Sequence, residues 1–211
     1  MAADVDLLFA HRPDARTPIE EVVRAMNALI DAGKTFYWGT SEWPATLLAE
    51  ARDVANRLGM VPPCCEQCSY SMLLRERVEL EYLPLYPELG LSVYSPLAGG
   101  ALTGEKPELA EEAGATEMLE RLRPIAARLG CSLAQLALAW AMCNERVSTA
   151  LFGASSPQQL EDNLGALEVL PKLTAAVMAE VEHALQNEPL PEGDVRFTTG
   201  FRTQATPLAK V

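Results

Sequence analysis

Short runs of β-prone residues alternate along the chain with longer segments whose apolar residues recur at helical spacing. The runs that predict strands are residues 5–10, 35–38, 64–67, 91–94 and 149–152. The first four begin at positions 5, 35, 64 and 91, a spacing of about one strand and one helix. The pattern therefore predicts a parallel sheet built from repeated strand–helix units.

Turn and cap residues mark the helical segments between these strands. Thr17 and Pro18, followed by two glutamates, are typical of a helix start, and Gly33 is typical of a helix end. Pro44 and Gly59 bracket a second helix in the same way. Residues 119–129 and 133–143 repeat apolar residues at helical spacing. We therefore expect two helices in the long gap before the last strand.

Two architectures are built from such units, the open doubly wound sheet and the eight-stranded barrel. The sequence contains no GxGxxG fingerprint of the open dinucleotide-binding sheet, and its first predicted strand ends in AHRPD. A polar residue instead follows or ends each predicted strand: His11, Ser41, Gln67, Ser95 and Ser155. This placement is typical of a barrel whose site lies at the carboxyl ends of its strands.

Five strands do not close such a barrel, which needs eight strands and about 250 residues. The predicted fold class is therefore α/β, a parallel (β/α)8 TIM barrel of which this chain covers about the last five units. Because the chain begins almost directly in a strand, we expect the missing units to precede Met1. A complete five-stranded α/β fold is the alternative that length leaves open. In an incomplete barrel, the strand edges at 5–10 and 149–152 would invite self-association.

Charge and composition narrow the range of partners. The chain has 17 basic and 29 acidic residues, a net charge of -12, which opposes binding to nucleic acid or to anionic membranes. No apolar run approaches the ~20 residues of a membrane-spanning helix, and the first ten residues lack the basic region of a secretory signal. The chain is therefore expected to be cytoplasmic, with no direct membrane insertion.

The cysteines raise the alternative of a zinc site. Cys64, Cys65 and Cys68 lie close enough in sequence to share a metal, but a structural site needs about four ligands and no second close pair of cysteines occurs. The five cysteines are odd in number and sit in apolar stretches. We expect reduced thiols and no metal.

Four stretches, in order, resemble the aldo-keto reductase superfamily, specifically its voltage-gated potassium-channel β-subunit branch, and the pattern is nearest to plant-type members. The stretches are AHRPDARTPIEE with YWGTSEW, EQCSYSMLLRERVELEYLPLY, YSPLAGGALTG and FGASSPQQLEDNLGALEVLPKL. The resemblance runs from about residue 5 to residue 187. It implies an aldo-keto reductase domain at 1–187, matching the family barrel from its fourth strand onward, and a flexible C-terminal tail at 188–211.

The resemblance also implies a chemistry. Active relatives combine an Asp, a Tyr, a Lys and a His, the Tyr giving a proton to a substrate carbonyl as NADPH gives hydride; a phenol needs a nearby cation for this role. The histidine alone has a matching position here, His11, which would hydrogen-bond the substrate oxygen. The alternative for His11 is a structural role at a strand end.

The cofactor positions that the resemblance implies are Ser41, Gln67, Tyr94, Ser95, Pro96, Leu97, Ala98, Gly99, Gly153, Ser155, Gln159, Asp162 and Asn163. Ser41 and Gln67 would meet the nicotinamide carboxamide, and Tyr94 would stack on the ring. Backbone N–H groups of 95–99 would wrap the pyrophosphate, and 153–163 would hold the adenosine end. Without the family, SPLAGG is an ordinary turn and the later stretch a solvated helix start.

Departures from the family pattern affect the cofactor's 2′-phosphate. Where relatives read TGKY, this chain has TGEK at 103–106, which shifts or removes a lysine and would put Glu105 beside the phosphate. A shorter stretch after Lys106 also removes an arginine. A charge-assisted contact is worth about 1.5–3 kcal/mol. NADP(H) is the expected cofactor, NAD(H) is not excluded, and we expect weak affinity with little preference for the 2′-phosphate.

Two functions use the same site. The first is an NADP(H)-dependent oxidoreductase that reduces a small aldehyde or ketone, which His11 favours. The second is a cytosolic auxiliary subunit that docks on a potassium channel α-subunit, peripheral to a membrane, which the branch resemblance favours. A third hypothesis is that the protein is a truncated, catalytically inactive chain. Whether the chain is an enzyme is left open, because the Asp/Tyr/Lys segment has no counterpart in it.

Overall fold

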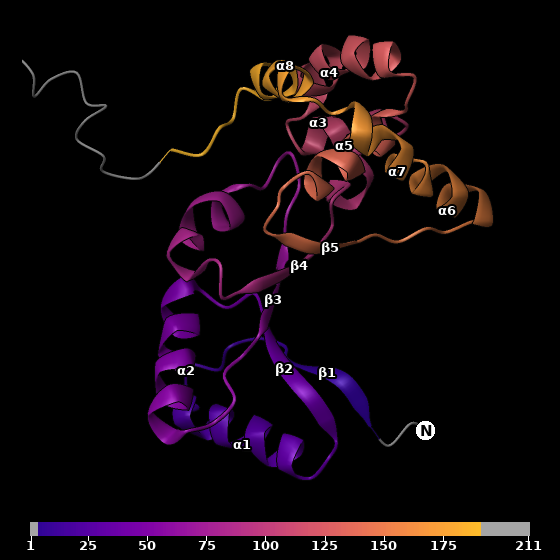
Figure 1. Ribbon diagram of the computed structural model, residues 1–211. Coiled ribbons are helices and arrows are strands. Elements are labelled where there is room, and N and C mark those ends of the chain that lie inside the picture. The colour runs from indigo at the N-terminus through magenta and orange to yellow at the C-terminus, as the bar shows by residue number, and fades with distance from the viewer. Residues whose placement is uncertain (1–3, 191–211) are drawn as a thin grey trace, which may run out of the picture.

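A computed structural model of the protein describes residues 4–190. Its five strands form one sheet in chain order: β1 (Val5–Ala10), β2 (Thr35–Ser41), β3 (Cys65–Ser69), β4 (Gly90–Tyr94) and β5 (Val147–Leu151). Every neighbouring pair is parallel. Figure 1 shows the five strands following one another across the sheet with helices between them. The predicted parallel α/β sheet, consistent with part of a TIM barrel, is confirmed.

Two strands run further than the sequence predicted. β2 continues to Ser41 and β3 to Ser69, because the ladders with their neighbours continue through these residues. β5 starts at Val147, earlier than predicted, since Val147 pairs with Leu91 of β4. Hydrogen bonding to a neighbouring strand, which a sequence pattern does not contain, sets these ends.

Helices and short helical turns connect the strands. They are α1 (Ile19–Asp31), α2 (Ala45–Leu58), η1 (Arg77–Glu81), η2 (Leu83–Leu85), η3 (Ala98–Thr103), α3 (Pro107–Glu112), α4 (Thr116–Leu129), α5 (Leu133–Met142), α6 (Pro157–Leu164), α7 (Ala166–Val169), η4 (Leu170–Lys172) and α8 (Ala175–Leu185). The gap before β5 holds three α-helices, whereas two were predicted. The additional helix, α3, has six residues, too few to show a periodic apolar pattern.

The predicted stops of the first two helices follow from backbone geometry. Gly59 is left-handed, with φ 65°, and the N–H of Met60 donates to the Ala55 carbonyl oxygen at 2.8 Å. Gly33 is left-handed as well, with φ 67°. Glycine takes this conformation without a Cβ penalty, so the chain leaves each helix at these points.

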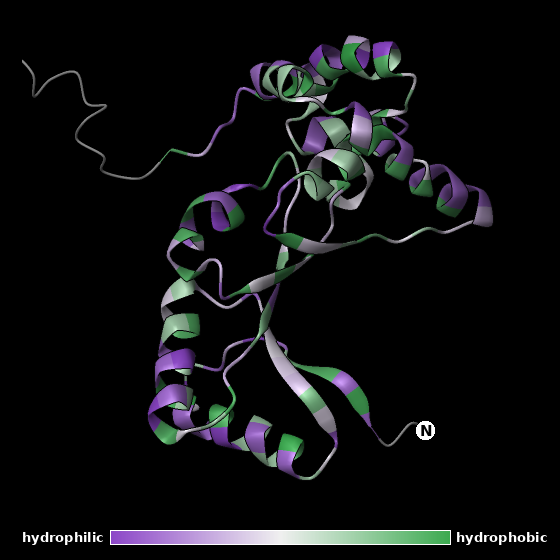
Figure 2. Cartoon of the chain, viewed as in Figure 1, coloured by the Kyte–Doolittle hydropathy of each residue, from purple (hydrophilic) through white to green (hydrophobic). Residues whose placement is uncertain are grey.

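The core lies between the sheet and the helices that pack on it. Trp38 on β2 and Leu48 on α2 are fully buried, and so is Val23 on the apolar face of α1. Figure 2 shows hydrophilic and hydrophobic residues mixed along α1 and α2, as expected for helices with one face in water. By contrast, α5 is buried along most of its length, including Leu136 and Trp140. Each such side chain contributes about 1.5–3 kcal/mol on burial.

A buried arginine ties α8 to the rest of the fold. Arg75 is 6% exposed and its Nη2 lies 2.8 Å from carboxylate oxygens of both Glu79 and Glu182. Its guanidinium also lies over the Trp140 ring, 5.2 Å from the centroid. The Arg75 Nη1 donates to Asn187 Oδ1 at 3.1 Å. Paired in this way, a buried cation fixes the last described helix against the β3–β4 connection.

The described residues end shortly after α8. The predicted tail at 188–211 therefore falls, beyond residue 190, outside the described residues. Within 4–190, no single helix is long and apolar enough to cross a membrane; α4 and α5 reach that length and hydropathy only when taken together, and they are bent by 88° at the break between them.

Candidate functional site

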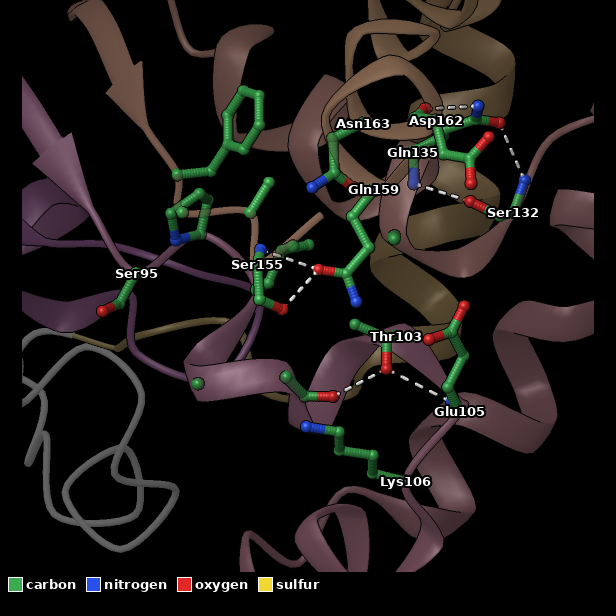
Figure 3. A pocket seen from close by; sticks show the side chains of 18 of the residues that line it. Ser95, Thr103, Glu105, Lys106, Ser132, Gln135, Ser155, Gln159, Asp162 and Asn163 are labelled. Carbon is green, nitrogen blue, oxygen red and sulfur yellow. Dashed lines mark hydrogen bonds between the residues drawn. The ribbon is translucent and has the colours of Figure 1, made fainter. Parts of the chain in front are cut away.

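A cavity of about 810 Å³ opens where the carboxyl ends of β4 and β5 meet the helices that follow them (Figure 3). This volume is in the range of sites for cofactor-sized ligands. Ten of the residues predicted for the cofactor line it: Tyr94, Ser95, Pro96, Leu97, Gly99, Gly153, Ser155, Gln159, Asp162 and Asn163. The segments that follow β4 and β5, about 55 residues apart in the sequence, line the same cavity because the two strands are neighbours in the sheet.

The first wall is a loop with unusual backbone conformations. Ser95 and Ala98 have φ of 55° and 49°, and Gly99 and Gly100 have φ of 66° and 105°. Two turns hold it, with the Ala98 N–H donating to the Ser95 carbonyl oxygen and the Gly100 N–H to the Leu97 carbonyl oxygen, both at 2.9 Å. A non-glycine residue in this region costs roughly 1–2 kcal/mol. Such strain concentrates at functional sites and motivates a ligand-binding role for this loop.

The opposite wall is the start of α6. Ser156 caps the helix, its Oγ accepting from the Gln159 N–H at 3.2 Å, and Pro157 occupies the first turn. Gln159 in turn folds back, and its Oε1 accepts from the backbone N–H and the hydroxyl of Ser155 at 2.9 and 2.8 Å. The two bonds between Ser155 and Gln159 are drawn in Figure 3. The arrangement places a helix N-terminus, with its partial positive charge, against the cavity.

A third segment of the lining was missed by the sequence analysis. Ser132 and Gln135 form a capping box at the start of α5, with bonds of 3.1 and 3.0 Å between each side chain and the other's backbone N–H. The Gln135 amide also donates to the Asp162 carbonyl oxygen at 2.7 Å, joining α5 to α6. The pattern Ser-x-x-Gln before an apolar run was the available signal. Other lining residues outside the predicted set are Gly100, Thr103, Glu105, Lys106, Ala134, Leu151, Phe152 and Ala154.

Three charged side chains belong to the lining, Glu105, Lys106 and Asp162. The Thr103 hydroxyl holds the backbone at Glu105, accepting from the Glu105 N–H at 3.2 Å and donating to the Gly100 carbonyl oxygen at 2.8 Å. Figure 3 shows Glu105 and Lys106 leaving the same short segment. The lining thus contains one lysine, Lys106, which directly follows Glu105 in the sequence.

Four predicted residues lie outside this lining. His11 is exposed and follows β1 directly, and Ala98 packs partly buried against the core. Ser41 and Gln67 are register partners at the ends of β2 and β3. The structure therefore groups the positions predicted for the pyrophosphate and adenosine, and leaves His11 and the carboxamide pair at the neighbouring strand ends.

Glu42 connects the strand ends on that side. Its Oε1 accepts from the Ser69 N–H at 2.7 Å, and its other oxygen pairs with Arg77 and lies 3.6 Å from Nη1 of Arg12. Burial raises the pKa of the Tyr94 phenol, and the neighbouring Glu42 raises it further, while Arg12 opposes them. The aromatic residue at the cavity edge is thus a weaker acid than a free phenol.

The cysteines do not form a metal centre in the described structure. Across residues 4–190, no group of three or more His, Cys, Asp or Glu side chains is placed to hold a metal ion. All five thiols are free, and burial, together with the adjacent Cys64, raises the pKa of Cys65 to about 11. A thiol at such a pKa is a poor ligand near neutrality.

The chain belongs to the aldo/keto reductase family, whose model matches residues 2–186. Among curated proteins it is 45% identical over 206 residues to a probable voltage-gated potassium channel subunit beta of Oryza sativa subsp. japonica. It is 44% identical over 206 residues to a protein of the same description in Arabidopsis thaliana. Each alignment covers 88% of this chain and 63% of the relative, so the chain spans less than two thirds of their length.

Proposed function

We propose that this chain binds a nicotinamide dinucleotide, NADP(H) or NAD(H), in the cavity between β4, β5 and α6. The observation that carries this proposal is that residues from 95–99, expected to hold the pyrophosphate, and residues from 153–163, expected to hold the adenosine end, line one cavity. The loop would meet a phosphate with backbone N–H groups other than those of Ala98 and Gly100, which its own turns use. The start of α6 would meet it with a helix N-terminus.

The cavity also has the room that a close backbone contact needs. A Cβ added at Gly99 or at Gly153 would meet nothing within 4 Å, so the lining is open at both points. At Gly100 the nearest atom would be a leucine methyl at 3.5 Å. A ligand can therefore approach the main chain of both walls.

The proposed reaction, for a barrel of this family that also holds the Asp, Tyr and Lys, is reduction of a small aldehyde or ketone. A bound nicotinamide would supply hydride. Of the family's catalytic side chains, His11 is the one with a counterpart in this chain, where it would donate a hydrogen bond to the carbonyl oxygen. Its exposed position immediately after β1 leaves the imidazole free to meet such a substrate. A cytoplasmic location is part of this proposal.

Two neighbouring glutamines on α6 provide a matched test of the cofactor site. Gln159 lines the cavity and Gln158 does not; the Gln158 amide instead donates to the Asp162 carboxylate at 3.1 Å. In calorimetric titrations with NADPH and NADH, Gln159→Ala should weaken binding about tenfold, because it frees Ser155 and loses a polar contact. Gln158→Ala should bind as the wild type does. Equal effects, or no binding by the wild type, would overturn the proposal.

A second candidate is an auxiliary subunit of a potassium channel. It is favoured by the names of both plant relatives, which are described as probable channel β-subunits and are 44–45% identical to this chain. In this role the cofactor site would be kept while catalysis is dispensable. Co-purification of the tagged chain with a co-expressed voltage-gated channel α-subunit tests it, with an unrelated acidic protein as control.

A further inference from the structure

A buried carboxylate lies behind the strand ends, outside the cavity. Glu66 in β3 is 0% exposed. Its neighbour Gln67 points to the other face of the sheet, since side chains alternate along a strand. Across the β2–β3 ladder, Thr40 is paired with Glu66 and Ser41 with Gln67. Each strand therefore contributes one residue to the proposed carboxamide pair and one to the layer behind it.

Glu66 holds both ends of the turn that follows β2. The Thr40 hydroxyl lies 2.5 Å from its Oε2, and the Trp43 N–H donates to its Oε1 at 3.2 Å. Ser41 lies between these two anchor points. One side chain of β3 thus fixes the path of residues 40–43.

The turn needs such anchors because its backbone is strained. Glu42 has φ of 59°, a conformation that costs a non-glycine residue roughly 1–2 kcal/mol. Its N–H donates to the Gln67 carbonyl oxygen at 3.1 Å, and the Tyr82 hydroxyl donates to the Trp43 carbonyl oxygen at 2.7 Å. Strained conformations persist where the surrounding structure determines them at several points.

We infer that Glu66 is the positioning residue for the nicotinamide end of the cofactor site: by pinning residues 40 to 43 from behind, it keeps Ser41 beside Gln67. This inference rests on the proposed function. Burying a carboxylate is unfavourable unless hydrogen bonds compensate for its lost hydration. An apolar side chain would fill the same space without that cost. The bonds from Glu66 go to the turn beside Ser41, which is the part of the fold that a carboxamide-binding site requires in one geometry.

Comparing two ligands separates positioning from general stability. NADH carries the carboxamide, whereas ADP-ribose carries the adenosine and pyrophosphate without nicotinamide. Glu66→Ala should weaken NADH binding about tenfold, the scale of a lost pair of hydrogen bonds, and change ADP-ribose binding less than about twofold. Calorimetric titration of the full chain with each ligand gives both dissociation constants.

Conservative and distant variants complete the experiment. Glu66→Gln keeps one acceptor for Trp43 N–H and one donor for Thr40, so it should restore NADH affinity. Glu79→Ala removes a partly buried carboxylate from the Arg75 cluster instead, and any change it causes should be equal for both ligands. Thr40→Val, which removes one anchor, replaces Glu66→Ala should the latter not fold, with an expected loss of about threefold for NADH alone.

The outcomes are distinct. Equal weakening of NADH and ADP-ribose by Glu66→Ala, or by Thr40→Val in its place, would reduce Glu66 to a structural role and overturn the inference while leaving the proposed function intact. Failure of Glu66→Gln to restore NADH binding would also overturn it. Absence of wild-type binding to either ligand would overturn the proposed function and the inference together.

Discussion

Two regions of the sheet, β4–β5 with α6 and β2–β3, hold their polar groups by different means. Around β4, β5 and α6, backbone conformation shapes the site, because Ser95, Ala98, Gly99 and Gly100 are left-handed. The polar side chains of Ser155 and Gln159 are exposed at the cavity. Around β2 and β3, a side-chain network lies behind the strands, and Glu66 at its centre has no exposed surface. The first region presents its polar groups to an open cavity, and the second uses them to hold strand ends in place.

The difference has an electrostatic consequence. Burial raises the pKa of Glu66 to about 7, and the nearby Glu42 carboxylate adds to this, although hydrogen bonds from Thr40 and from the Trp43 N–H oppose it. On the cavity side, the charged residues Glu105 and Lys106 are exposed and consecutive in the sequence. The free energy of unfolding should therefore depend on pH through Glu66 in the β2–β3 region. The preference between NADPH and NADH should depend on the charged residues that line the cavity.

The largest expected effect concerns catalysis. We expect the 211-residue chain to reduce a reactive aromatic aldehyde with NADPH no faster than background, and His11→Ala to behave identically. Burial raises the pKa of Tyr70, Tyr82 and Tyr86, so these phenols are poor proton donors near neutrality. Absence of a general acid costs about two to four decades of rate. Following NADPH oxidation spectroscopically measures this.

One result would reverse that expectation. Turnover well above background that disappears in His11→Ala would show that the strand ends of this chain form a self-sufficient reductase site. The ends of β1 to β3 would then take part in catalysis directly.

The second effect is the pH dependence of stability through Glu66. A carboxyl whose pKa is raised on folding stabilises the fold below its unfolded pKa, near 4.5, and this stability is lost as pH rises through about 7. This increase in the pKa of Glu66 corresponds to about 3 kcal/mol of free energy of unfolding. Relative to wild type, Glu66→Gln should therefore gain up to about 3 kcal/mol in free energy of unfolding between pH values near 5 and near 8, measured by urea denaturation.

An exposed glutamate supplies the control of opposite sign. Hydrogen bonds from Arg24 and Arg57 lower the pKa of Glu20, so its contribution is present at neutral pH and lost on acidification. Glu20→Gln should accordingly lose stability relative to wild type as pH rises, where Glu66→Gln gains it. A loss of stability with rising pH in both variants would rule out a raised Glu66 pKa.

The third effect distinguishes ligand affinity from stability by substituting two glycines, one in the cavity lining and one outside it. A Cβ at Gly153 enters open space in the cavity, so Gly153→Val should leave thermal stability unchanged and reduce NADH affinity about tenfold or more by occupying that space. Gly33 also has open space but has φ of 67°. Gly33→Ala should therefore cost about 1 kcal/mol of stability and leave NADH affinity unchanged.

The smallest effect is the discrimination between cofactors. We expect NADPH and NADH to bind within about tenfold of each other, since the Glu105 carboxylate opposes the attraction of Lys106 for a 2′-phosphate. Glu105→Lys should raise affinity for NADPH by about tenfold and leave that for NADH unchanged, as measured by fluorescence titration. A wild-type preference for NADPH of two decades or more would contradict this and require another cation at the site.

Much of the fold could be predicted because each signal was local. Alternation and apolar runs gave the five strands, and glycines such as Gly33 and Gly59 gave the helix stops. The motif order gave the family, which the match over residues 2–186 confirms. The short helix α3 was missed because its six residues show no period.

The sequence by itself determined which residue types stand after each strand, and thereby the family and the chemistry to expect. The tertiary structure alone decided which of them share a space: Ser95 and Ser155 line one cavity because β4 and β5 are neighbours, whereas His11 lies at the far end of the sheet. It also decided that Glu66, one residue from a predicted cofactor contact, is buried with two hydrogen bonds. Burial and pairing are long-range properties, set by which strands and helices meet, and a local pattern of residues does not contain them.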